Sequence, residues 1–328
     1  MMKAGFPLVS VVIPNYNHAS YLRERIESVL QQDYPNFEVL LLDDCSTDNS
    51  RDIIAQYADN PHVRSIILND KNTGNTFIQW DRGIRAAQGE YVWIAESDDV
   101  ATADFLSTLI PPLADNHDAV VAFAHSRLID AEGNTLAELL DEEEGRICIH
   151  DGKQFCNRHM LIGNAIYNAS MYVFQRAAYE KVNPQFINCK YSGDWFFAID
   201  LCVQGLVIEV NRPLNAFRQH PNKVTMRAHT NTRHWIDETA TTLEIIKRLD
   251  MPHFKAMGLR GRLRKRIRKG PLDEETRAIL AKQWPEMLRP NLKETLAYII
   301  GKNILGYFHR EKHLLNIDSI SKNRLHAI

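Results

Sequence analysis

Three short polar clusters in the first hundred residues carry side chains that could bind a charged ligand. They are PNYN at residues 14–17, the pair Asp43 and Asp44, and ESDD at residues 96–99. Carboxylates repel phosphate groups unless a divalent cation lies between them. Aspartates beside a phosphate therefore form a natural site for Mg²⁺ or Mn²⁺. These residue types are compatible with a phosphate-containing ligand that is held through a metal ion.

Each polar cluster follows a segment with the pattern of a buried strand, a continuous apolar run rich in β-branched side chains. The expected strands are residues 8–13, 37–42, 63–68 and 91–95, and the expected helices between them are residues 20–32, 49–58 and 77–87. Strands that alternate with helices predict a parallel sheet with helices on both faces. Ligands bind outside the carboxyl ends of parallel strands, so the three clusters should lie on one rim of the sheet.

The pattern is less regular after residue 100. We expect a helix at 102–113 that Pro111 and Pro112 disturb, and a hairpin turn at 130–134. Further strands are expected at 119–124, 170–174 and 206–210, and a further helix at 194–204. Strand signals stop near residue 225. The sequence therefore predicts an α/β fold, a mostly parallel sheet flanked by helices at residues 1–225, with a helical C-terminal extension at residues 226–328.

Composition narrows the class of protein. The 328 residues are 45% hydrophobic and 24% charged, which is typical of globular proteins and excludes a disordered or low-complexity chain. The five cysteines are odd in number and widely spaced, which argues against a disulfide framework or a thiolate zinc site and favours a reducing compartment. We find neither a signal peptide nor an apolar run of membrane-spanning length. We expect a cytoplasmic protein, either soluble or peripheral on the inner face of the membrane.

Two common phosphate-binding motifs are missing. A G-x-G-x-x-G fingerprint does not follow the first strand, and no G-K-[ST] sequence occurs, which excludes a dehydrogenase and a glycine-loop phosphate site. Instead, SVVIPNYNHASYLRERIESVLQQDYPNFEVLLLDDCSTDNS, followed by GEYVWIAESDD, resembles the nucleotide-sugar domain of glycosyltransferase family 2. That resemblance covers roughly residues 7–220 and implies the type A fold of glycosyltransferases.

The resemblance assigns roles to the three polar clusters. It implies that Pro14 and Tyr16 line the base pocket, where the Tyr16 ring can stack on a planar base. The alternative for Tyr16 is simple packing on the first helix. Asp44 would accept a hydrogen bond from a uracil-like ring N–H, Asp98 would face the ribose or the metal, and Asp99 would ligate the metal, Mn²⁺ or Mg²⁺.

Neighbouring acidic residues have less defined roles. Asp43 is expected to bond the turn backbone, and Asp48 to cap a helix. Glu96 replaces the first aspartate of the family motif, and its contact with the donor stays open. Arg82 could reach the diphosphate, but an exposed helical arginine is the simpler interpretation, while Trp80 should lie in the core.

Two residues in the second half complete the implied site. Asp194 stands where the family places its catalytic base, although it could instead cap the helix that follows. His220 matches a histidine that many relatives carry near the metal, although a histidine in a loop is often only solvated.

The resemblance implies a metal-dependent, inverting glycosyltransferase that moves a sugar from a nucleotide-diphosphate sugar, UDP-linked, to a saccharide or lipid-linked acceptor. Bacterial cell-surface polysaccharide assembly is a plausible setting. One alternative is a sugar nucleotidyltransferase, but this sequence lacks the basic glycine-rich loop that such enzymes need. The other is a non-catalytic nucleotide-binding protein.

A basic helix is predicted near residues 259–269. Leu259, Leu263 and Ile267 recur every four residues, and arginines and lysines fill its other faces. Two alternatives are open for such a helix: it can lie on an anionic membrane surface, which would then be a partner, or it can pack its leucines onto the catalytic domain. Nucleic acid is not expected, because no base-reading motif or interleaved aromatic residues accompany the basic run.

Overall fold

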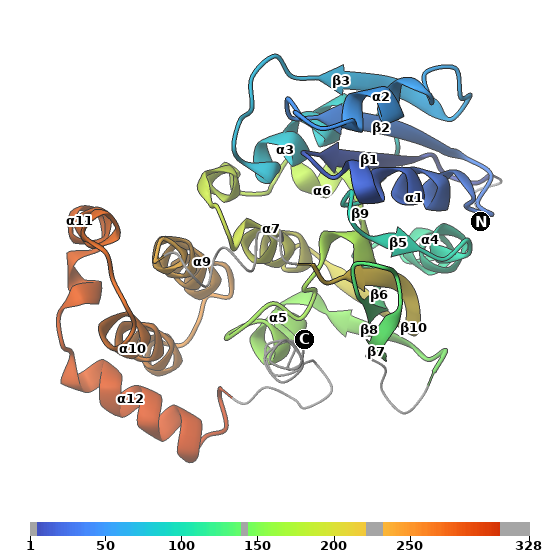
Figure 1. Cartoon of the computed structure of the whole chain (residues 1–328). Coiled ribbons are helices and arrows are strands. Elements are labelled where there is room, and N and C mark those ends of the chain that lie inside the picture. Colours follow the sequence, from blue (N-terminus) through green and yellow to red (C-terminus); the bar gives the residue numbers. More distant parts are fainter. Residues whose placement is uncertain (1–4, 139–143, 221–231, 309–328) are drawn as a thin grey trace.

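Ten strands form one sheet in the computed structural model, which describes residues 5–138, 144–220 and 232–308 (Figure 1). They are β1 (Val9–Asn15), β2 (Phe37–Asp43), β3 (Val63–Leu68), β4 (Tyr91–Ile94), β5 (Val100–Ala101), β6 (Ala119–Ile129), β7 (Thr135–Glu138), β8 (Ile147–Asp151), β9 (Tyr172–Gln175) and β10 (Leu206–Arg218). Their order is β3-β2-β1-β4-β9-β6-β10-β5, with β7 on β6 and β8 on β10. Strands β1, β2, β3, β4, β6 and β10 run in one direction, which confirms the predicted mostly parallel sheet.

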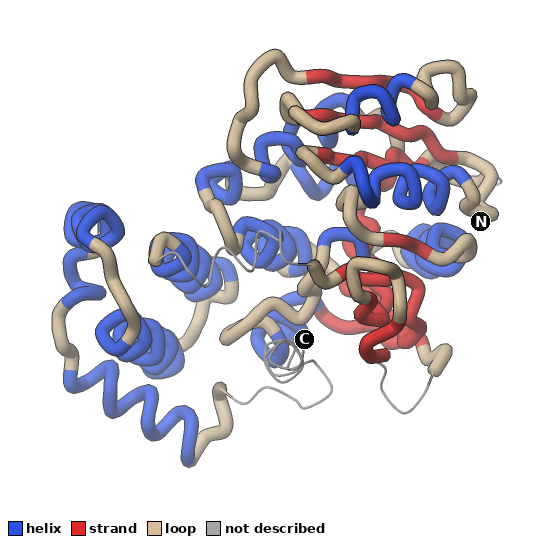
Figure 2. Tube along the Cα trace, in the orientation of Figure 1, coloured by secondary structure: helices blue, strands red, loops and turns tan. Residues whose placement is uncertain are grey.

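Helices cover both faces of the sheet (Figure 2). They are α1 (Ala19–Leu30), α2 (Ser50–Ala55), α3 (Thr76–Ala86), α4 (Phe105–Asp115), α5 (Gly152–His159), α6 (Arg176–Tyr179), α7 (Gly193–Cys202), α9 (His234–Arg248), α10 (His253–Lys269), α11 (Glu274–Gln283) and α12 (Leu292–Asn303). Alternate residues of β1 point to opposite faces. Val11 and Ile13 therefore share a core with α1, α2 and α4, whereas Val12 shares one with α3, α5 and α7.

The paired prolines do not end α4 as predicted. The helix continues through Pro111 and Pro112 to Asp115. Leu109, Ile110 and Leu113 are fully buried on this helix. Burial of these side chains outweighs the loss of two backbone donors, which explains why a helix-breaking signal is overridden here.

The C-terminal helices form a small hydrophobic core of their own and also contribute side chains to the large core of the sheet domain. Trp235, Leu263, Ile267, Leu280 and Met287 make up the small core. Ile245 of α9 and Leu259 of α10 belong instead to the large core that contains α7. The helical region is therefore packed against the sheet domain, while the predicted boundary near residue 225 falls outside the described residues.

Of the two alternatives for α10, membrane docking and packing, the structure supports packing, because the aliphatic side chains of α10 are buried. Leu259, Leu263 and Ile267 are each 1% exposed. Arg264 is also buried and donates to Glu294 of α12 at 2.7 and 2.9 Å. Arg266 is ion-paired with Glu238 of α9. The basic residues thus hold the helical region together, and the leucines pack mostly within it. In the described part of the chain, no helix combines the length and the apolar character needed to cross a membrane.

Candidate active site

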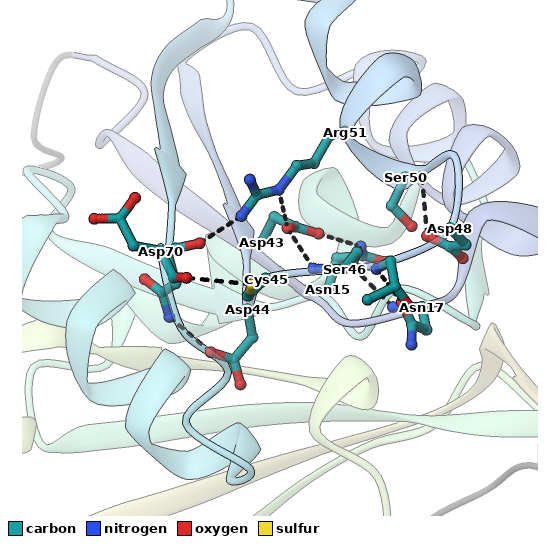
Figure 3. Close-up of polar contacts among 12 residues, drawn as sticks. Asn15, Asn17, Asp43, Asp44, Cys45, Ser46, Asp48, Ser50, Arg51 and Asp70 are labelled. Carbon is teal, nitrogen blue, oxygen red and sulfur yellow. Dashed lines mark hydrogen bonds and ion pairs between the residues drawn. The ribbon is translucent and has the colours of Figure 1, made fainter.

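The loops that follow β1 and β2 are fastened to each other at the carboxyl end of the sheet (Figure 3). Asn15 donates to Asp43 at 2.9 Å and to the Ser46 hydroxyl at 3.2 Å. Asp43 also accepts from the Ser46 backbone and from Arg51 Nε, both at 2.9 Å. The predicted structural role of Asp43 is therefore confirmed.

Asp48 fastens the first turns of two helices. Its carboxylate accepts from the backbone N–H groups of Ala19 at 2.9 Å and Ser50 at 3.0 Å, the first residues of α1 and α2. The N-cap position of α2 itself is Asn49, which makes no capping bond with its side chain. Asp48, one residue before the N-cap of α2, thus caps the first turns of both α1 and α2.

Asp44 is buried and anchors the loop between β3 and α3. Its carboxylate accepts from Asn69 at 2.7 Å, from the Thr73 hydroxyl at 2.7 Å and from Gln79 at 3.0 Å. The Thr73 backbone N–H adds a further bond at 3.0 Å. These donors fix the orientation of the carboxylate at the rim of the sheet.

Tyr16 and Pro14 lie at the end of β1. Pro14 is buried within the strand and pairs with Leu42 of β2. Tyr16 comes directly after the strand and is 44% exposed. A tyrosine that packed only on α1 would be more covered, so its exposure favours a ring available for stacking.

Glu96 begins the ESDD cluster and points toward the core. It accepts a hydrogen bond from the Trp80 indole N–H at 2.7 Å, and Trp80 is buried as predicted. Burial, together with the neighbouring carboxylates of Asp98 and Asp99, raises the pKa of Glu96 to about 8. Glu96 therefore carries a proton at neutral pH, which suits a structural contact better than a metal ligand.

His18, Asp98 and His220 come together at the rim. One possible ligand atom from each lies within 4.8 Å of the other two. His220 Nε2 is 2.9 Å from Asp98 Oδ2, and His18 Nδ1 is 2.8 Å from the Ser97 hydroxyl. Burial lowers the pKa of His18, so its ring is neutral near pH 7. Imidazole nitrogens and a carboxylate form a donor set that a divalent transition metal can accept.

Asp99 is not one of the three residues of this cluster. It is 1% exposed, and it accepts from the Asn168 side chain at 2.7 Å and from the Arg218 backbone at 3.0 Å. Arg218 in turn donates to the Asp98 backbone carbonyl at 2.8 Å and to Glu24 at 2.5 Å. Asp99 therefore ties the end of β10, which leads to His220, to the cluster that contains Asp98.

Arg25 places a positive charge beneath the three acidic residues. It is completely buried, and its Nε donates to the Glu96 backbone carbonyl at 2.8 Å. Its two terminal nitrogens have no hydrogen-bond partner among the described residues. Burial lowers the pKa of Arg25 to about 10, although Asp99, Asp98 and Glu96 oppose this change. The guanidinium thus offsets part of the repulsion among these carboxylates.

Asp194 lies in the first turn of α7. The helix N-cap is Ser192, and Asp194 is the second helical residue. Burial raises the pKa of Asp194 to about 6, although hydrogen bonds from the Trp195 backbone and the Asn164 side chain oppose the increase. An aspartate with a pKa near neutrality can serve as a general base.

A carboxylate from the C-terminal helices holds the segment that leads to Asp194. Asp237 of α9 is 2% exposed. One of its oxygens accepts from the backbone N–H groups of Lys190 at 2.7 Å, Tyr191 at 2.6 Å and Ser192 at 3.3 Å. The helical region therefore contributes directly to the position of Asp194.

Arg82 and a second polar cluster lie outside this arrangement. Arg82 is exposed on α3 and hydrogen-bonds Asn69, as expected for a helical surface arginine. At the beginning of β10, Glu209 accepts from His125 at 3.0 Å and from His150 at 2.8 Å. These two bonds lower the pKa of Glu209 in spite of its desolvation. The network joins β6 and β8 to β10, at the opposite end of β10 from His220.

Several residues of the site are not among those predicted from the sequence, and three of them show what the sequence could reveal. His18 directly follows PNYN in the sequence, so its position on the same rim of the sheet could have been predicted. Arg218 stands two residues before His220, so its position was also accessible. Asp237 gives no signal, because an acidic residue in the first turn of a helix is common.

Comparison with known proteins identifies the relatives of this chain. The pattern described as Glycosyl transferase family 2 matches residues 10–182. Glycosyltransferase GlyG of Streptococcus pneumoniae is 35% identical over 127 residues, which are 39% of this chain and 42% of GlyG. A putative teichuronic acid biosynthesis glycosyltransferase, TuaG of Bacillus subtilis, is 39% identical over 93 residues, which are 28% of this chain and 36% of TuaG. The chain thus matches less than half the length of these relatives.

The fold is also similar to a solved structure. The 1–349 part of TarS from Staphylococcus aureus, in complex with UDP-GlcNAc, superimposes with a TM-score of 0.60. The match covers 92% of this chain and 81% of the TarS chain, at 18% sequence identity. At that identity the likeness establishes a common fold, which agrees with the fold class predicted from the sequence.

Proposed function

Because the chain belongs to glycosyltransferase family 2, we propose that it transfers a sugar from a nucleotide-diphosphate sugar to a hydroxyl group of an acceptor. The observation that carries this proposal is the meeting of His18, Asp98 and His220 within 4.8 Å at the same rim as the exposed Tyr16. A base at Tyr16 and a metal-bound diphosphate at Asp98 would lie at neighbouring strand ends, β1 and β4.

We place the nucleobase against Tyr16, above the buried Pro14. Asp44 would accept a hydrogen bond from the base N–H, and the bonds from Asn69, Thr73 and Gln79 would keep its carboxylate oriented. The UDP-GlcNAc complex of TarS, which shares this fold, supports a UDP-linked donor.

The residues present fit a divalent cation. His220 Nε2 lies 2.9 Å from Asp98 Oδ2, and one possible ligand atom from each of His18, Asp98 and His220 lies within 4.8 Å of the other two. We assign the cation to Asp98, His220 and His18, and we give Asp99 the positioning role that its contacts indicate. Imidazole ligands favour Mn²⁺ over Mg²⁺, which prefers oxygen ligands. When bound, the cation would neutralise charge that develops on the leaving diphosphate.

Asp194 acts on the acceptor in this mechanism. Its carboxylate takes the proton from the acceptor hydroxyl as the oxygen attacks the anomeric carbon. A single displacement from the face opposite the diphosphate inverts the configuration of that carbon, as in inverting glycosidases. The segment held by Asp237 would keep Asp194 in place. The name of TuaG suggests that the acceptor belongs to a cell-surface polysaccharide.

A donor screen tests the proposal. The full chain would be incubated with UDP-, GDP- and dTDP-linked sugars, with and without Mn²⁺, and release of the nucleoside diphosphate would be measured. We expect release from one class of donor only with Mn²⁺, and loss of release in Asp98→Ala. Asp70→Asn, an exposed aspartate at the end of β3, is the matched control and should behave as the wild type. Pyrophosphate production from a nucleoside triphosphate and a sugar phosphate would instead indicate a nucleotidyltransferase.

A further inference from the structure

The outer face of α12 is unusually apolar. Leu292, Leu296, Ile299 and Ile300 recur at helical spacing and are 74, 49, 44 and 36% exposed. Ile304 and Leu305 follow directly, at 75 and 45%. Single exposed aliphatic residues are normal on a soluble protein, but a contiguous stripe marks an interaction surface. We call these six residues the α12 stripe.

The packing of α12 on α10 fixes which side faces outward. A Cβ atom on Gly261 of α10 would lie 2.1 Å from the Glu294 carbonyl oxygen, so the two backbones approach closely there. Ala297 and Gly301 are buried on the same side of α12. The stripe therefore cannot rotate into the core. In Figure 1, α12 lies at the lower edge of the helical region, next to α10.

The charge on this face has one sign. Glu294 is the single acidic residue of α12, and it is buried and paired with Arg264 at 2.7 Å. The exposed charged residues of α12 are Lys293 and Lys302. Lys265 of α10 adds a third ammonium group, 5.6 Å from the centre of the Tyr298 ring. The outward face of α12 thus consists of aliphatic side chains flanked by lysines.

We propose that α12 docks the protein on an anionic membrane surface, with the stripe in the interfacial region and the lysines against lipid headgroups. Helices that lie in the plane of a membrane combine an apolar face with flanking basic residues in this way. A symmetric contact between two copies fits less well, because it would bring the lysines of both copies together without an exposed carboxylate on α12 to pair with them. This inference does not depend on the proposed function.

Vesicle co-sedimentation tests the docking surface. The full chain should sediment with vesicles of phosphatidylcholine and phosphatidylglycerol, bind pure phosphatidylcholine far less, and dissociate as salt rises. Each lysine near an anionic surface contributes about fivefold in affinity, so Lys293→Gln with Lys302→Gln should reduce binding about 25-fold. Leu296→Glu with Ile299→Glu should abolish it, and both positions are exposed enough to leave the fold intact. The matched control is Ile149→Glu, 53% exposed on β8, which should bind as the wild type.

Three outcomes would overturn the proposal. The first is a wild-type chain that ignores anionic vesicles at low salt. The second is equal binding by the stripe variant and the Ile149→Glu control. The third is a dimer, seen by light scattering at low salt, that the Leu296→Glu, Ile299→Glu variant dissociates, because the stripe would then be an interface between protein copies.

Discussion

If Asp194 is the general base, transfer should depend on a group that titrates near pH 6. Burial raises the pKa of this carboxyl to about 6 from its ordinary value of 3.8. A base with that pKa is about 90% ionised at pH 7 and about 10% ionised at pH 5. The kcat/KM for transfer should therefore fall about tenfold between these values. An aspartate with an ordinary pKa would stay ionised, and the rate would be nearly constant.

The assay separates transfer from donor binding. Transfer is followed as acceptor-dependent release of the nucleoside diphosphate from pH 5 to 8, and the donor Kd is measured at each pH by calorimetry. Asp194→Asn should lower kcat by about 10²–10⁴-fold, as is typical when a general base is lost. Its donor Kd should change little, because Asp194 acts only when the acceptor attacks.

The same substitution should make the protein more stable at neutral pH. The folded-state pKa of Asp194 is raised, so the unfolded state loses this proton first as pH increases. Stability therefore decreases with rising pH between about 4 and 6, and asparagine removes this penalty. Above pH 6, Asp194→Asn should melt at a higher temperature than the wild type, and the difference should vanish near pH 4. An inactive but more stable variant cannot owe its inactivity to unfolding.

Asp200 provides a matched control on the same helix. Burial also raises the pKa of Asp200 to about 6, but its carboxylate accepts from the Asn183 backbone and from Arg248. In Asp200→Asn, kcat/KM should still fall about tenfold from pH 7 to pH 5, as in the wild type; we call this fall the acid limb of the pH profile. The assignment of Asp194 would be refuted by a flat wild-type profile between pH 5 and 7, or by an acid limb that moves with Asp200.

Further predictions concern the metal site, the stacking of the nucleobase on Tyr16, and the positioning of Asp194 by Asp237. Asp98→Ala should weaken Mn²⁺-dependent nucleotide binding at least about tenfold by calorimetry, whereas Asp99→Asn should mainly lower the melting temperature; the reverse pattern would return the metal to Asp99. Tyr16→Ala should weaken donor binding by about five- to 150-fold, the range for one stacked base, and Tyr16→Phe should not; equal effects would argue against stacking. Asp237→Asn should lower kcat with little change in donor Kd. It should also shift the acid limb of the pH profile to lower pH, because the Asp237 charge raises the pKa of Asp194. An unchanged acid limb would contradict this coupling.

The architecture of the first hundred residues follows from local patterns. Strands buried on both faces give continuous apolar runs, and β1, β2 and β4 were predictable for that reason. Strand β8 was not, because its alternating, half-exposed residues are at an edge and depend on pairing with β10. The course of α4 through two prolines likewise depends on burial that only the tertiary structure reveals.

The site could be predicted only where its residues are close in sequence. Asp98 stands in a recognisable cluster, but its contact with His220 joins residues 122 positions apart. Asp99 belongs to the same cluster and nevertheless points to Asn168 and Arg218. Adjacent carboxylates on an irregular turn face different directions, and the sequence does not specify which of them faces the ligand.

The C-terminal helices show why an amphipathic pattern alone does not identify a membrane-binding helix. Both α10 and α12 carry regularly spaced aliphatic residues, and α10 has the greater positive charge. Two arginines of α10 are ion-paired, Arg264 with Glu294 and Arg266 with Glu238. Its aliphatic residues are buried, Leu259 in the large core and Leu263 and Ile267 in the small core. The buried ion pair with Arg264 removes from α12 the one carboxylate that would repel an anionic surface, and close packing against Gly261 turns the aliphatic stripe outward. An aliphatic face is therefore available for binding on α12 and not on α10, because the aliphatic residues of α10 are buried, and Arg264 of α10 helps to fix the orientation of α12 through Glu294.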